Sequence, residues 1–148
     1  MKKIGTYTVR GSGLEGSAIK VQLFDGRFDT AYKVTKFTIW PVSVQDAYDH
    51  RAVGKLGTTD DLQTASATFM NADDNREIAW CGIANGAIES VIIEEGLVDT
   101  DNLIVEDLYV YFRSNQNEKV NYMITMDKYD ISEWQGALAM VRNSAQNV

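Results

Sequence analysis

The chain has 148 residues and a formal net charge of −7, with 45% hydrophobic and 24% charged residues. These values are typical of one folded domain and exclude a largely disordered chain. The acidic balance disfavours nucleic-acid binding, and no apolar run approaches the roughly 18 residues that span a bilayer. We therefore expect a single domain over residues 1–148, made in a cytoplasm, without a signal peptide or a membrane partner.

Short β-type segments separated by turn residues fill the first part of the chain. Strands are predicted over Lys3 to Arg10, Ile19 to Leu23 and Tyr32 to Ile39. The apolar face of the third segment shifts near Thr35-Lys36, which predicts a β-bulge. Pro41 is expected to end this strand, because proline cannot donate to a central ladder.

The middle of the chain is less regular. Ser43 to Leu62 predicts a long excursion, with one helical turn around Asp46 to His50. Strands are then expected over Thr64 to Met70, Glu77 to Ile83 and Ala87 to Glu94. The links between these segments are rich in Asn, Asp and Gly, which favour turns.

Two different periods meet in the last third of the chain. Apolar residues alternate with polar ones in two runs joined by a polar turn: Leu108, Val110 and Phe112, then Val120, Tyr122, Ile124 and Met126. This pattern predicts a β-hairpin.

A C-terminal helix is expected over about residues 132–143. Ser132 and Gln135 have the spacing of a capping box, which satisfies two backbone amides at a helix start. The helix face expected to pack on the core consists of Trp134, Ala137, Leu138 and Val141. Gly136 weakens a helix by roughly 1 kcal/mol relative to Ala, so we expect a close approach of the helix to a sheet there.

Eight or so antiparallel strands and one terminal helix predict a mainly β protein built as a two-sheet sandwich. A jelly roll of two four-stranded sheets is the preferred topology, and an immunoglobulin-like sandwich stays open.

The residues that most often carry chemistry are scarce. His50 is the only histidine, no Gly-x-Ser-x-Gly elbow is present, and we expect His50 to be a solvated loop residue. Cys81 is the only cysteine and is expected to be a buried, inert thiol. One histidine and one cysteine cannot supply a tetrahedral zinc site.

Carboxylate and glycine patterns are also better explained by turns and strands. The turns Asp73-Asp74-Asn75 and Asp99 to Asn102 lack an EF-hand loop, although calcium binding there stays open. Neighbouring strand residues such as Glu94-Glu95 and Glu106-Asp107 point to opposite faces and do not converge on a substrate. Gly11 to Gly16 spells G-x-G-x-x-G, but a strand rather than a helix is expected after it.

Three tryptophans on a sandwich could form a sugar-stacking platform, but a role in the core is the stronger interpretation. Trp80 and Trp134 are expected in the core, and Trp40 at a strand end is expected to be the most exposed. We therefore predict no catalytic, cofactor-binding or metal-binding residue, and a protein that is not an enzyme.

Three segments of the C-terminal third, Asn102 to Tyr111, Val120 to Ile124 and Asp127 to Gln146, resemble small proteins encoded by marine tailed bacteriophages. Ala31 to Trp40 and Glu77 to Gly82 match more loosely. The resemblance implies a virion structural protein, made in the host cytoplasm and acting as a capsid or capsid-decorating subunit. It implies self-assembly into a homo-oligomer and contacts with other virion proteins. The alternative is a receptor- or glycan-binding module of a phage fibre.

Overall fold

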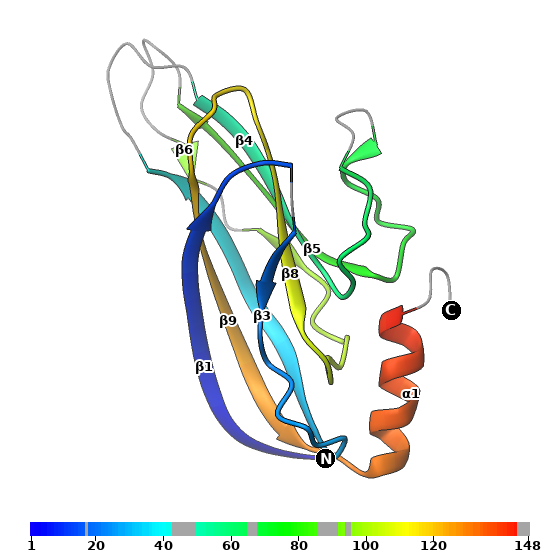
Figure 1. The fold of residues 1–148 in the computed structure, drawn as a ribbon. Helices are drawn as coiled ribbons and strands as arrows, with labels where there is room; N and C mark the ends of the chain where they lie inside the picture. The colour runs from blue at the N-terminus through cyan, green and yellow to red at the C-terminus, as the bar shows by residue number, and fades with distance from the viewer. Residues whose placement is uncertain (17, 43–49, 65–67, 86–91, 94–95, 145–148) are drawn as a thin grey trace.

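The computed structural model describes residues 1–16, 18–42, 50–64, 68–85, 92–93 and 96–144 (Figure 1). The elements in chain order are β1 (Lys2–Gly13), β2 (Ile19–Val21), β3 (Thr30–Pro41), β4 (His50–Gly57), β5 (Glu77–Asn85), β6 (Ile92–Ile93), β7 (Leu97–Val98), β8 (Leu108–Ser114), β9 (Val120–Asp130) and α1 (Glu133–Ser144).

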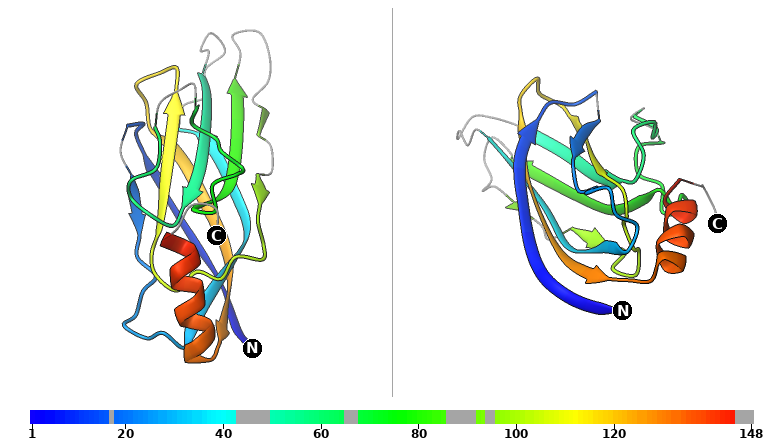
Figure 2. Two further views of the ribbon diagram at one scale, coloured as in Figure 1. Left: turned by 90° about the vertical axis from the view of Figure 1, so that its right-hand side faces the viewer. Right: turned by 60° about the horizontal axis from the view of Figure 1, so that its bottom comes forward.

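The strands form two antiparallel sheets that lie against each other, with the C-terminal helix beside them (Figure 2). Within the described residues, one sheet has the order β1-β9-β3 and the other β2-β8-β4-β5-β6, with β7 also paired to β5. The prediction of a mainly β fold with two antiparallel sheets and a C-terminal helix is therefore confirmed. Sheets of three and six strands differ from the expected four and four, and this strand order does not confirm the jelly roll.

The predicted hairpin between β8 and β9 is wrong. β8 pairs with β2 and β4 in the larger sheet, whereas β9 pairs with β1 and β3 in the smaller one. The chain therefore crosses from one sheet to the other between these strands. Period-two alternation shows which face of a strand is buried, and a strand that turns into the facing sheet has the same pattern as one that pairs with its neighbour.

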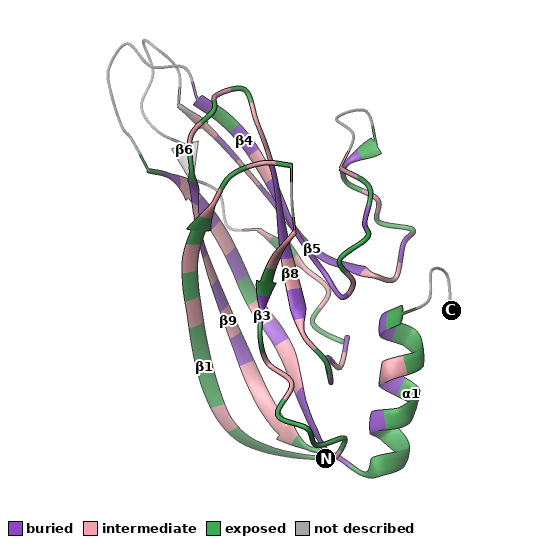
Figure 3. Ribbon diagram, in the orientation of Figure 1, coloured by how far each residue is buried: buried purple, intermediate pink, exposed green. Residues whose placement is uncertain are grey.

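The main core lies between the two sheets, where buried residues alternate along the strands (Figure 3). All seven alternating residues of β8 and β9 are buried: Leu108, Val110, Phe112, Val120, Tyr122, Ile124 and Met126. Cys81 is also buried in this core, as expected. The expected bulge in β3 is confirmed, since the register with β9 shifts between Val34 and Lys36.

The expected excursion from Ser43 to Leu62 is wrong in its second half, where β4 pairs with both β5 and β8. The sequence pattern does not predict this strand, because its apolar alternation is interrupted by Gly54, Lys55 and Gly57. The described part of the expected strand Thr64 to Met70 is not a strand. Only Ile92–Ile93 of the expected strand Ala87 to Glu94 is described, and residues 43–49, most of the expected helical turn, lie outside the described residues.

The helix begins with the predicted capping box. The Ser132 amide donates to Gln135 Oε1 at 3.1 Å, and the Gln135 amide donates to Ser132 Oγ at 3.2 Å. The orientation of α1 differs from the prediction, because its buried residues are Gly136, Ala139 and Asn143. No helical segment that the structure describes has the length and hydropathy needed to cross a bilayer.

Candidate functional site

A second, smaller core lies on the outer face of the larger sheet. Strand alternation places Leu56 of β4 in the main core and Lys55 on the opposite face. The segment after β4 folds back over this face, so that Leu62 and Phe69 pack with Tyr111 of β8. This cover removes the Lys55 side chain from solvent completely, with 0% of its surface exposed.

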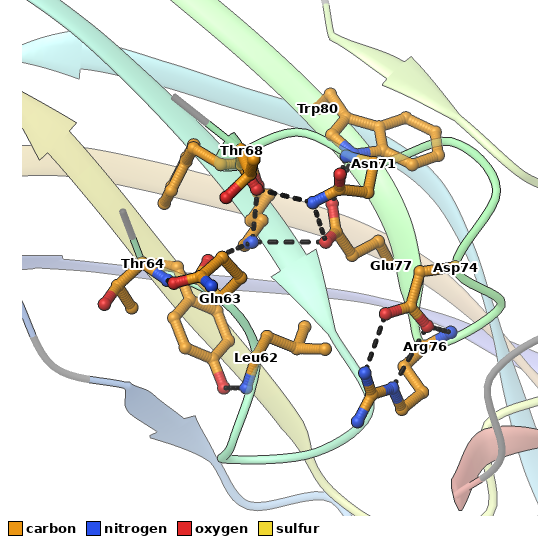
Figure 4. Close-up of polar contacts among 12 residues, drawn as sticks. Leu62, Gln63, Thr64, Thr68, Asn71, Asp74, Arg76, Glu77 and Trp80 are labelled. Carbon is orange, nitrogen blue, oxygen red and sulfur yellow. Dashed lines mark hydrogen bonds and ion pairs between the residues drawn. The ribbon is translucent and has the colours of Figure 1, made fainter. Parts of the chain in front are cut away.

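The Lys55 ammonium has a full set of partners (Figure 4). Nζ donates to the Gln63 carbonyl at 2.6 Å, to the Phe69 carbonyl at 2.5 Å and to Glu77 Oε2 at 3.2 Å. The Phe69 and Tyr111 rings lie 4.4 and 5.4 Å from Nζ, measured to their centroids. The amine is therefore held in one position in a largely apolar environment.

The Glu77 carboxylate joins this lysine to Asn71. Its Oε1 accepts the Asn71 backbone N–H at 2.9 Å and the Trp80 indole N–H at 3.0 Å. Its Oε2 accepts the Asn71 side-chain Nδ2 at 3.2 Å, the same distance as to Lys55 Nζ. Only 1% of the Glu77 side chain is exposed, so the amine and the carboxylate are buried, whereas the carboxamide of Asn71 is partly exposed.

Burial lowers the pKa of Lys55, and the nearby Glu77 charge opposes this shift only in part. This shift is in the direction of the uncharged amine, the form of lysine that acts as a nucleophile.

Sequence analysis missed this site entirely. A lysine inside the otherwise apolar run Ala52 to Gly57 was the one available signal, because a strand buried on both faces seldom contains an unpaired charge. The partners Asn71 and Glu77 come together with Lys55 only through the fold.

His50 is the reverse of the expected solvated loop residue: it begins β4 and is fully buried. Its Nε2 lies 2.7 Å from Ser114 Oγ. However, an acyl-transfer site needs backbone N–H groups that point at the oxyanion of the substrate. The Ser114 amide instead donates to the Glu15 carboxylate at 2.9 Å. The pair therefore gives no support to nucleophilic catalysis.

Asp74 and Asp99, one from each of the turns considered for calcium, make structural contacts. Asp74 is buried and binds the Arg76 guanidinium through both oxygens, at 3.0 and 2.8 Å, and this bond to Arg76 lowers the pKa of Asp74. Asp99 accepts bonds from Asp101 and Asn102 within its own turn. Over the described residues, no group of three or more His, Cys, Asp or Glu side chains has a geometry suited to a metal ion.

The remaining sequence candidates are dispersed. Glu106 is exposed, whereas Asp107 accepts the amides of Leu23 and Phe24 at 2.8 and 3.0 Å. Glu94-Glu95 lies outside the described residues. The run Gly11 to Gly16 leads into β2 rather than a helix, as expected.

The predicted exposures of the three tryptophans are wrong. Trp134 is the exposed one, at 72%, while Trp40 is half-buried. Trp80 is also half-buried and lies outside the main core, on the outer face near Glu77. The three indoles therefore do not form a sugar-stacking platform.

An exposed apolar stripe runs along α1, made of Trp134, Ala137, Leu138 and Val141. These residues follow the i, i+3, i+4, i+7 spacing of one helix face. The opposite face docks through small residues, since Ala139 packs beside Ala31, Val105 and Ile131. A Cβ on Gly136 would lie 1.9 Å from the Phe28 carbonyl oxygen, so the close approach expected at this glycine is to a loop.

The fold and these sites define a two-sheet β-sandwich with a buried Lys–Glu–Asn cluster and an apolar helix face turned to solvent. No model of a known protein family matches the chain, and a search of curated proteins gives no match.

Proposed function

We propose that the protein is a non-enzymatic structural subunit that assembles with copies of itself through the α1 stripe. The observation that carries this proposal is the exposure of the stripe: 72% for Trp134, 54% for Leu138 and 58% for Val141. The capped helix places its largest apolar side chains in water and docks through Gly and Ala. Monomeric proteins seldom expose contiguous apolar patches larger than a few hundred Å², so this face is suited to a protein contact.

The arrangement of the stripe fits a second copy of the same helix. A two-fold axis between Ala137 and Leu138 puts Trp134 opposite Val141 of the second copy, and Ala137 opposite its Leu138. The stripe is therefore complementary to itself when the helices run antiparallel, as an isologous interface requires.

The contact extends beyond the helix. Phe28, 46% exposed, lines an open hollow together with Glu133, Ala137 and Met140. A stable interface buries about 800 Å² on each partner. In the proposed dimer the stripe forms the apolar centre of the interface, and the loop around Phe28 enlarges the buried area.

Size-exclusion chromatography with light scattering tests this assembly. The purified protein is expected to be a dimer or larger, and Leu138→Glu is expected to be monomeric. Leu97→Glu is the matched control, because Leu97 is 74% exposed but lies in β7, away from the stripe. A wild-type monomer at high concentration would refute the proposal.

The wider setting that we propose is the virion of a tailed bacteriophage, where the protein serves as a capsid or capsid-decorating subunit. The resemblance of the C-terminal third supports this setting, and the self-complementary α1 stripe suits repeated copies. Mass spectrometry of purified particles tests it independently of the oligomer measurements. Absence of the protein from the particles would reject the virion setting and leave the self-assembly proposal standing.

A further inference from the structure

We propose that Lys55 and Asn71 become joined by an intramolecular isopeptide bond, with Glu77 transferring protons between the two side chains. This inference is independent of the proposed function. It rests on the arrangement of the three groups at the outer face of the larger sheet (Figure 4).

The side chains of Lys55 and Asn71 lie close together because both hydrogen-bond to the same oxygen atom of Glu77. Lys55 Nζ and Asn71 Nδ2 each lie 3.2 Å from Glu77 Oε2. Asn71 is held in place by its backbone bond to Glu77 Oε1 at 2.9 Å and by the bond from Nδ2 to the Thr68 carbonyl at 2.6 Å. Glu77 Oε2 therefore lies between the amine that must give up a proton and the amide nitrogen that must receive one.

Proton transfer from Lys55 to Glu77 prepares both partners for reaction. It leaves an uncharged amine with a free electron pair and a carboxylic acid beside Nδ2, the nitrogen that must be protonated before it leaves. Burial lowers the pKa of Lys55, because an apolar environment stabilises charge poorly. The Phe69 and Tyr111 rings around Nζ provide that environment.

The reaction is a transamidation that needs no oxidant or cofactor. Nζ attacks Asn71 Cγ to form the new C–N bond, and the bond from Cγ to Nδ2 then breaks. One amine proton passes through Glu77 to Nδ2, which leaves as ammonia, and the other proton stays on the new amide. The product replaces a buried ion pair by a covalent link between β4 and the segment that covers it. Such a link restricts the unfolded chain in the way a disulfide does.

Intact-mass spectrometry of the purified full-length protein tests the bond. The mass is expected to be lower than the sequence mass by one ammonia molecule. Trypsin digestion after complete denaturation locates the link, because an acylated Lys55 is not cleaved. Residues 52–76 should therefore appear as one peptide, with the same mass deficit. The full sequence mass, with normal cleavage after Lys55, would overturn the proposal.

Ammonia is also lost when an asparagine cyclises to a succinimide. That reaction leaves Lys55 free, so an ammonia deficit combined with normal cleavage after Lys55 also overturns the proposal.

Three variants separate the roles of the residues. Asn71→Asp should react with loss of water instead of ammonia, and its linked form should have the same mass as linked wild type. Lys55→Arg and Glu77→Gln should keep their full sequence masses, because the first lacks a nucleophilic amine and the second lacks the proton-transfer group. Asn117→Ala, at an exposed asparagine, is the matched control and should show the ammonia deficit.

Circular dichroism checks the fold of each variant. If Lys55→Arg or Glu77→Gln fails to fold, the masses of wild type and Asn71→Asp still decide the question. Two masses that each equal the respective sequence mass would refute the bond.

Discussion

Phe112 in β8 and Tyr122 in β9 face each other across the space between the two sheets, with their ring centroids 6.1 Å apart. The two strands follow one another in the chain but belong to different sheets. Both rings are buried, so the pair fixes the larger sheet against the smaller one where the chain crosses between them.

Replacement of Phe112 by alanine should therefore loosen the contact between the sheets. We expect Phe112→Ala to lower the free energy of unfolding by about 3–5 kcal/mol, because it removes a buried ring and leaves a cavity. Urea unfolding followed by circular dichroism measures this loss. Leu97→Ala is the control at an exposed apolar position and should change stability by no more than about 0.5 kcal/mol.

Tyr111 predicts a loss of stability at alkaline pH. Burial raises its pKa from 10.0 to about 12. Folding is therefore favoured while the phenol is protonated, and this contribution is lost as pH rises from the unfolded value through the folded one. The Tyr111 hydroxyl donates to the Thr59 carbonyl at 2.6 Å and accepts the Leu62 amide at 3.3 Å.

We expect Tyr111→Phe to cost about 1–3 kcal/mol at neutral pH, because the Leu62 amide loses its partner. The difference between wild type and variant should shrink as pH rises through the interval from 10.0 to about 12. Urea unfolding at neutral pH and within that interval measures both values. A difference that stays constant with pH would contradict the assignment.

Replacement of Gly136 by alanine should change stability in the direction opposite to that expected from helix propensity. Alanine is a better helix former by about 1 kcal/mol, yet Gly136→Ala should destabilise the protein. The new Cβ would lie 1.9 Å from the Phe28 carbonyl oxygen, so α1 must move away from the loop. Thermal unfolding should show a lower midpoint.

Ala137→Gly is the matched control on the exposed side of the same helix. It should also lower the midpoint, by an amount equivalent to about 1 kcal/mol, through propensity alone. A stabilised Gly136→Ala protein would show that the helix does not dock as described.

Asp107 predicts sensitivity to acid. Burial raises the pKa of Asp107, but the amides of Phe24 and Leu23 that bind it outweigh this effect, so its pKa lies below the usual value. A carboxylate of this kind stabilises the fold above its unfolded pKa of about 3.9, and the contribution is lost as pH falls through the lower folded value.

We expect Asp107→Ala to cost about 1–3 kcal/mol at pH 7, since two amides lose their acceptor. Asp107→Asn keeps Oδ1 as an acceptor and should cost less. The cost of Asp107→Asn should fall towards zero in strong acid, as denaturant titrations at several pH values would reveal. A cost that does not change with pH would rule out a role for the charge.

The sequence predicted the inward face of every strand in the last third. It also predicted the bulge in β3 and the capping box at Ser132, because alternation, register shifts and caps depend on neighbouring residues. The sequence did not predict which strands pair with each other. β8 and β9 have the pattern of a hairpin, yet each pairs with strands far away in the chain, since alternation records burial and not the neighbour that provides it.

The α1 stripe shows the same limit for a helix. The sequence identified Trp134, Leu138 and Val141 as one apolar face but assigned that face to the core. In the structure the small side of the helix is the one that fits against the loop at Phe28. Periodicity locates an apolar face and cannot say whether its partner belongs to the same chain.

The sequence by itself determined the fold class, the buried faces of β8 and β9 and the position of the helix, because each follows from the spacing of residues close together in the chain. Only the tertiary structure decided the division into sheets of three and six strands, the exposure of the α1 stripe and the meeting of Lys55, Asn71 and Glu77. Those features depend on contacts between distant segments, which local patterns do not encode.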